Sequence, residues 1–219
     1  MQSFKQVIIS ILAVLVILGC SLVKGQASSP TSPQEILTQL NQRFTAIKDY
    51  QCQVVSTKYK NGKPKQDGHK YYFKKPQLIR LEVNIGKDKG AVAVYNKAGK
   101  VRAHAGGILS IITITMEPND KRLQDGDGGT FVTSHLGGTI KDIEKAVSSG
   151  NATLSQVKLD RDYYQLQVDR NNRRDIILID TQLMLPITWD TFIDGKLNSK
   201  TEWKSLQVDI GVADSLFNL

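Results

Sequence analysis

Cysteine and histidine are scarce in this chain of 219 residues, which has two cysteines and three histidines. If Cys20 is modified, Cys52 has no partner within the chain, so no disulfide is expected and the stability must come from core burial. His69, His104 and His135 are scattered, and none has a second histidine, cysteine or carboxylate at the spacing of metal ligands. The sequence therefore predicts no metal site.

Catalytic signatures are also missing. The chain has no phosphate loop and no dinucleotide-binding fingerprint. Its serines Ser110, Ser134 and Ser155 lack the G-x-S-x-G context of a nucleophile elbow. We therefore predict no catalytic residue and no cofactor, and we do not expect an enzyme.

Positive charge is in excess, with a formal net charge of +8 and a pI of about 9.4. The basic residues are spread along the chain with acidic residues between them, and the densest cluster lies in an Asn-rich turn, where we expect it to be solvated: Arg170, Arg173 and Arg174. Nucleic acid is therefore not an expected partner. A positive balance suits an anionic lipid surface at least as well.

One apolar run is long enough to be a targeting signal. It extends from Val7 to Gly19 after a short basic start, which is typical of the h-region of a signal peptide. Ile17, Leu18 and Gly19 before Cys20 match a bacterial lipobox, with a small residue next to the cysteine and an aliphatic residue three places before it. We therefore predict a lipoprotein signal peptide over residues 1–19 and acylation of Cys20.

Two other interpretations of the N-terminus stay open. The signal could be cleaved near Gly25 or Ala27 by a conventional peptidase, or it could remain as an uncleaved anchor helix extended to Val23. All three predict export, and the lipobox adds an anchor in a membrane of the bacterial envelope, on its extracytoplasmic side.

The folded part is predicted to begin after a polar tether over residues 20–32 and to form one domain over residues 33–219. Ser32, Pro33 and Glu35 form a helix-start signature, and apolar residues at helical spacing extend the predicted helix to about Asp49. A second helix is predicted from a cap at Thr139 to a stop at Gly150.

Between and after these helices the period is two and turn signals are closely spaced, which predicts an antiparallel meander. The expected strands are 51–59, 69–75, 78–85, 91–95, 100–105, 153–159, 163–168, 175–180, 187–193 and 201–208, together with a buried strand in the apolar segment 107–116. The expected architecture is α+β, with one strongly curved sheet and two to three helices. The patterns alone favour a filled core over an open cavity.

Several segments resemble the LolA-like family of lipoprotein carriers and its relatives of the LolB, LppX and RseB type. These segments are the opening helix into residues 44–47, the run 72–76 that leads into 78–82, and the ending with Trp203, Val212, Asp214, Leu216 and Phe217. The resemblance covers most of residues 33–219. It implies a half-open antiparallel barrel with helices as a lid on its concave side.

The resemblance also implies a cavity for acyl chains. The residues expected to line it are Leu40, Phe44, Ile47, Phe73, Ile79, Leu81, Val92, Val94, Ile140, Ile143 and Trp189. Soluble carriers of the family have an arginine directly before the proline that joins two strands, and that arginine holds the lid shut. Lys75 occupies this position here, and it is the candidate contact to the lid.

The function expected from this resemblance is non-enzymatic. An envelope lipoprotein would bind lipid acyl chains or a lipoprotein in an apolar cavity, for transfer, acceptance or sensing. The partners would be a lipid or an acylated lipoprotein, and the membrane through the anchor. The alternative is a regulatory or structural module of the same fold that carries no lipid and binds another envelope protein.

Overall fold

The computed structural model describes residues 29–124 and 129–219. The predicted signal peptide, Cys20 and most of the predicted tether lie outside the described residues. Within the described ranges, no helix has the length and apolar character needed to cross a membrane.

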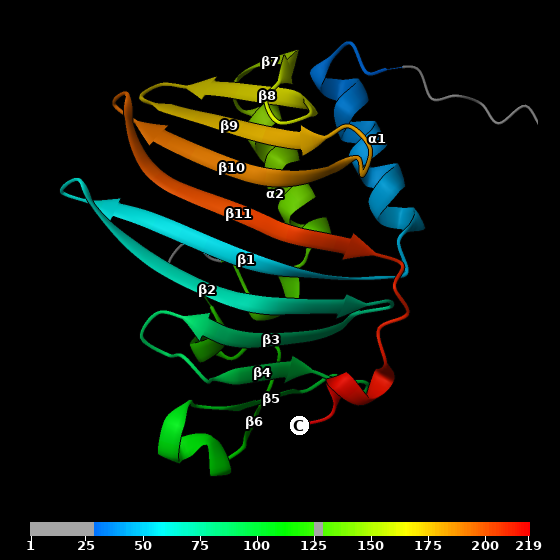
Figure 1. Ribbon diagram of the computed structural model, residues 1–219, viewed down its shortest axis with the longest axis vertical. Coiled ribbons are helices and arrows are strands. Elements are labelled where there is room, and N and C mark those ends of the chain that lie inside the picture. The colour runs from blue at the N-terminus through cyan, green and yellow to red at the C-terminus, as the bar shows by residue number, and fades with distance from the viewer. Residues whose placement is uncertain (1–28, 125–128) are drawn as a thin grey trace, which may run out of the picture.

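One antiparallel sheet organises the described chain (Figure 1). Its order is β6-β5-β4-β3-β2-β1-β11-β10-β9-β8-β7, so the first and last strands pair in the middle and the edge strands β6 and β7 do not meet. The strands are β1 (Asp49–Lys60), β2 (Lys63–Lys74), β3 (Leu78–Ile85), β4 (Val92–Tyr95), β5 (Val101–His104), β6 (Ile114–Met116), β7 (Asn151–Lys158), β8 (Asp162–Arg170), β9 (Arg173–Asp180), β10 (Leu185–Ile193) and β11 (Lys196–Val208). The predicted α+β class with an open antiparallel sheet is confirmed.

Three hairpin turns are formed by residues that tolerate a left-handed backbone. Asn61, Asn171 and Asp194 have φ angles of 51°, 47° and 49°, in the left-handed region that asparagine and aspartate tolerate better than most residues. These turns set the register of the long hairpins β1–β2, β8–β9 and β10–β11.

Helix α1 (Pro33–Ala46) starts at the predicted signature. The Ser32 hydroxyl accepts a hydrogen bond from the Glu35 amide at 3.2 Å, and the Glu35 carboxylate accepts one from the Thr31 amide at 2.6 Å. The helix ends before the predicted Asp49, because that residue already begins β1.

Helix α2 (Leu136–Ser148) starts earlier than predicted. The predicted cap, Thr139, is wrong, because His135 caps the helix: its Nδ1 accepts a hydrogen bond from the Gly138 amide at 3.3 Å. Gly137 and Gly138 therefore lie inside the first turn of the helix and not before its start.

Both glycines permit close packing. A Cβ at Gly137 would lie 2.3 Å from the Phe44 ring of α1, and one at Gly138 would lie 1.8 Å from the Thr133 carbonyl oxygen. A larger residue at Gly137 would push α2 away from α1, and one at Gly138 would clash with the backbone of η3 (Phe131–Thr133).

The two α-helices contact each other and lie together on one side of the sheet, behind it in Figure 1. One core cluster joins Ile36 and Leu40 of α1 and Ile140 and Ile143 of α2 to inward residues of β8 and β9. A second cluster lies between the helices and strands β1 to β3. The helix-covered face of the sheet is therefore well packed near α1.

The prediction of a buried strand over residues 107–116 is wrong. Residues Gly107–Ile111 form a 3₁₀ helix, η1, and only Ile114–Met116 form the edge strand β6. Ile108 and Ile111 are 92% and 86% exposed. The segment is apolar enough for a core, but none of the described elements covers it. Three further 3₁₀ helices are η2 (Lys121–Leu123), η3 (Phe131–Thr133) and η4 (Asp214–Phe217).

Candidate functional site

A cleft of about 1350 Å³ opens between helix α2 and the helix-covered face of the sheet. The lining residues are Lys58, Tyr59, Lys60, Lys65, Gly129, Thr130, Thr133, His135, Gly138, Thr139, Lys141, Asp142, Lys145, Ala146, Arg170, Arg173, Trp189, Thr191, Ile193, Asn198, Ser199, Thr201 and Trp203. Pockets for small molecules usually have about 300 to 1000 Å³, so this cleft has room for an elongated ligand.

The cleft follows from a change of polarity along the strands. On β9 the inward residues are Ile179 and Ile177, which pack in the first core cluster, and then Asp175 and Arg173. On β11, which is separated from β9 by β10, the inward residues Thr201 and Ser199 are also polar. Apolar side chains would close against α2, whereas these polar ones leave the space open.

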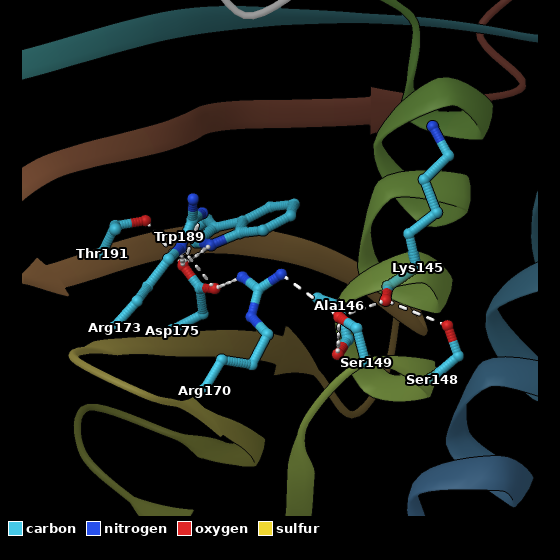
Figure 2. A network of polar contacts seen from close by, with 9 residues as sticks. All are labelled: Lys145, Ala146, Ser148, Ser149, Arg170, Arg173, Asp175, Trp189 and Thr191. Atoms are coloured by element: carbon cyan, nitrogen blue, oxygen red, sulfur yellow. Dashed lines mark hydrogen bonds and ion pairs between the residues drawn. The ribbon is translucent and has the colours of Figure 1, made fainter.

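A buried carboxylate, Asp175, organises one wall of the cleft (Figure 2). Its oxygens accept hydrogen bonds from Trp189 Nε1 at 2.9 Å and from the Thr191 hydroxyl at 2.7 Å. Arg173 donates through Nε at 2.9 Å to Oδ2 and through Nη2 at 3.0 Å to Oδ1, and Arg170 makes an ion pair through Nη2. One carboxylate thus fixes four side chains that line the cleft.

Asp175 is ionised in this setting. Burial acts to raise the pKa of its carboxyl, but the hydrogen bonds from Arg173, Trp189 and Thr191 outweigh burial, so the pKa lies below its ordinary value. The charge of the carboxylate is shared by two guanidiniums, and one positive charge is therefore left in excess.

The opposite wall, α2, is fixed at both ends. At its start the Leu136 amide donates to the Tyr50 hydroxyl at 2.9 Å, and the His135 ring stacks on Phe44 with centroids 5.5 Å apart. At its end Ser149 donates to the Lys145 carbonyl at 2.8 Å and accepts from Arg170 Nη1 at 3.5 Å, as Figure 2 shows. The cleft is therefore preformed.

Positive charge dominates the lining. Seven lining residues are cationic, namely Lys58, Lys60, Lys65, Lys141, Lys145, Arg170 and Arg173, and Asp142 is the one acidic residue among those described in the lining. Lys145 pairs with Asp142 at 2.9 Å, and Lys65 with Asp67 at 3.7 Å. Lys58, Lys60 and Lys141 form no ion pair with a carboxylate in the described part of the chain.

His135 adds no positive charge at neutral pH. Burial, with a contribution from the Lys141 charge, lowers the pKa of His135 to about 4. Tyr59, Trp189 and Trp203 place aromatic surface among the cations. The cleft is suited to a ligand with both an anionic and an apolar part.

No protein-family model matches the chain, and no curated protein matches it. Solved structures do match. MucB has 15% sequence identity over 85% of this chain and 62% of the MucB chain, with a TM-score of 0.52. The Mycobacterium tuberculosis lipoprotein LppX has 8% identity over 80% of this chain and 97% of its own, with a TM-score of 0.45. A LolA superfamily protein from Nitrosomonas europaea has 10% identity over 87% and 99%, with a TM-score of 0.40.

The chain has the LolA-like fold. The similarity to MucB, over most of this chain, carries that conclusion, and it extends to the fold alone. The chain spans less than two thirds of MucB.

Within the LolA-like fold, the residues expected to line an acyl cavity are divided among packed clusters. Leu40, Ile140 and Ile143 lie in the first cluster with Trp189 against it. Ile47, Phe73 and Ile79 lie in the second, with Phe44 and Leu81 beside it. Of these residues, Trp189 also lines the cleft. That these residues line a cavity for acyl chains stays a prediction.

Val92 and Val94 lie elsewhere. The register pairs them with Glu82 and Arg80, which places them on the opposite face of the sheet from Ile79 and Leu81. Val94 is buried there against the C-terminal segment, in a cluster with Leu78, Val212 and Phe217.

Lys75 contacts the helix that the LolA-like resemblance assigns to the lid. Its Nζ donates to the Phe44 carbonyl at 2.9 Å and to the Thr45 carbonyl at 2.5 Å, and it lies 5.4 Å from the centre of the Phe44 ring. A cation at the C-terminal end of α1 is favourable for the helix dipole. Lys75 therefore makes a point contact with α1 where an arginine would make a planar one.

The other reactive groups that the structure describes form no second site. Burial raises the pKa of the Cys52 thiol to about 12 and lowers that of His69 to about 4, so both are neutral at pH 7. His104 Nδ1 lies 2.9 Å from the Ala105 carbonyl oxygen. Among the described residues, no group of histidine, cysteine and acidic side chains could hold a metal ion.

Sequence reasoning did not find the cationic cleft. The cluster of Arg170, Arg173 and Arg174 is predicted to be solvated, and Arg173 and Arg174 are exposed, whereas Arg170 is half-buried. Arg174 pairs with Asp169 at 2.6 Å, but Arg170 and Arg173 both pair with the buried Asp175. The signal that could have found the cleft is the position of Asp175, which shares strand parity with Ile177 and Ile179. A carboxylate on a buried face requires cationic partners.

Proposed function

We propose that this chain is a non-enzymatic binding protein of the bacterial envelope that takes an amphiphilic ligand, a lipid or the acylated segment of a lipoprotein, into the cleft beside α2. The observation that supports this most strongly is the cleft itself, with its volume of about 1350 Å³ and its aromatic surfaces. Its walls are fixed by Asp175 on the sheet and by contacts at both ends of α2.

The location and the partners belong to the same proposal. The signal-like run before Cys20 and the lipobox support export and acylation, which would hold the protein at a membrane on its extracytoplasmic side. A tethered protein of this kind would receive, hold or sense a lipid near that membrane and would not travel between membranes.

Filling the cleft tests the proposal. Thr201 lies on its floor, opposite Trp189 in the β10–β11 register, and Thr201→Trp places a large ring in the space. A tryptophan is compatible with a strand, so the fold should persist. We expect the affinity of the full chain for lipid to fall at least about tenfold, which corresponds to about 1.4 kcal/mol. Displacement of a bound fluorescent fatty acid by lipid measures this affinity.

The matched control is Thr153→Trp. Thr153 is exposed on β7, and its side chain faces away from the side on which Ala152 and Leu154 pack. This variant should bind the probe like the parent chain. Equal binding by the parent and both variants, or the absence of any lipid from the native protein in mass spectrometry, would contradict the proposal.

A second candidate function is supported by the exposed aliphatic patch of η1 and β6. The patch consists of Ile108, Leu109, Ile111, Ile112 and Ile114. Exposed apolar residues that gather in one place mark interaction sites more often than single ones do. The patch favours an interaction module that binds another envelope protein through this edge of the sheet.

Site-specific photocrosslinking in cells tests this second function. A crosslinking residue at Ile111 should give one discrete adduct with an envelope protein, and Ile108→Ser should remove most of it by reducing the apolar contact. Leu159, which is 62% exposed at the other edge of the sheet, is the matched control position. Equal adducts at both positions would rule out a specific role for the patch.

A further inference from the structure

Cations from five elements converge on the cleft. Lys58 and Lys60 come from β1, Lys65 from β2, Arg170 from β8, Arg173 from β9, and Lys141 and Lys145 from α2. A solvated face of one helix or one hairpin would not give this convergence. The fold itself gathers positive charge around one space.

Part of this charge is held in a fixed geometry. Arg173 directs Nε and Nη2 at Asp175, which leaves Nη1 without a hydrogen bond to any described residue. Arg170 is fixed between Asp175 and Ser149 (Figure 2). A guanidinium that is already oriented loses little rotamer entropy when it binds an anion.

The rest of the charge lacks neutralising partners in the described chain. Lys58, Lys60 and Lys141 are exposed and form no ion pair with a described carboxylate. Like charges that face one space repel each other, and an anion between them would relieve the repulsion. The aromatic rings of Trp189 and Trp203 lie in the same lining and would suit an apolar chain.

We infer that the cleft recognises the anionic head group of its ligand, a phosphate or a carboxylate, through Arg173 together with Lys58, Lys60 and Lys141. This inference rests on the proposed function and adds the chemical class of the ligand to it. It also assigns a role to Asp175, which positions the arginines and does not itself contact the ligand.

Calorimetric titration of the full chain, below micelle-forming concentrations, tests the inference with three probes. Dodecyl phosphate carries an anionic head, dodecyl maltoside carries a neutral head on the same chain, and inorganic phosphate carries no chain. We expect dodecyl phosphate to bind about tenfold more tightly than dodecyl maltoside, and inorganic phosphate to bind more weakly than both.

The variant K58Q/K60Q/K141Q should lose this preference and keep its affinity for dodecyl maltoside. The matched control, K87Q/K89Q/K158Q, removes the same charge from exposed positions outside the cleft and should keep the preference. Added salt should weaken the binding of dodecyl phosphate alone.

Other outcomes overturn the inference in distinguishable ways. Equal affinity of the parent chain for both amphiphiles removes the anionic class and leaves the proposed function intact. Inorganic phosphate that binds as tightly as dodecyl phosphate shows a site for the free ion, and the head-group assignment fails. If neither amphiphile binds, the proposed function and the inference fail together.

Discussion

Asp175 is the residue on which the cleft depends most. It is fully buried, yet it is surrounded by donors from β8, β9 and β10, so its desolvation is offset by several charged or polar hydrogen bonds. Removing the carboxylate charge leaves two arginines facing each other without their shared counterion. The effect on stability should therefore exceed that of an exposed ion pair.

We predict that Asp175→Asn lowers the free energy of unfolding at pH 7 by about 3 to 5 kcal/mol, as in other buried pairs that lose one partner. Urea unfolding measures this difference. The folded-state pKa of Asp175 is lowered, so its contribution is complete above the unfolded value of about 4 and is lost as the pH falls through the folded value. The difference between parent and variant should therefore shrink below pH 4.

Asp142→Asn is the matched control. Asp142 pairs with Lys145 at 2.9 Å on the exposed side of α2, and exposed pairs contribute little to stability. A difference between the parent and Asp175→Asn that stayed constant from pH 7 to pH 3 would show that the loss is one of packing and not of charge.

At the scale of the element, local rules explain what the sequence predicts correctly. The start of α1 depends on Ser32 and Glu35, which lie within four residues of each other, and the hairpins depend on Asn61, Asn171 and Asp194. Capping and turn chemistry are local, so the sequence of one chain is enough to place them. The paired strands then follow from the turns.

The errors at this scale concern contacts across the chain. The apolar character of residues 107–116 indicates a need for burial, but it contains no information about which element covers the segment. The start of α2 is not predictable from its own residues, because the glycine at position 137 is needed for close packing against Phe44, which lies more than 90 residues earlier. The cleft was missed for the same reason, since its charges come from five separate elements.

At the scale of the whole molecule, the C-terminal segment joins the two halves of the sheet. After β11 the chain runs past β1 and β2 to β3, as Figure 1 shows in red. It packs there on the face of the sheet that the α-helices leave uncovered. Lys74 donates to the Val212 carbonyl at 2.7 Å, and Arg80 donates to the Leu216 carbonyl at 3.0 Å. Lys74 and Lys97 each reach Asp214 at 2.6 Å.

Phe217 is the apolar centre of this join. It is buried against Leu78, Val94 and Val212 on the face of the sheet that the α-helices do not cover. Phe217→Ala removes a buried ring, and we predict a loss of about 3 to 5 kcal/mol in the free energy of unfolding. Hydrogen exchange should rise most in β3 to β5, because the segment stabilises that half of the sheet directly.

Ile210→Ala is the matched control, since Ile210 lies in the same segment and is 45% exposed. It should change stability much less, because little apolar surface is returned to water. Equal exchange increases in β3 to β5 and in β8 to β9 after Phe217→Ala would show one cooperative unit. β8 and β9 carry the Asp175 network, so a change confined to β3 to β5 would instead leave the cleft intact. The stability of β3 to β5 would then be independent of ligand binding in the cleft.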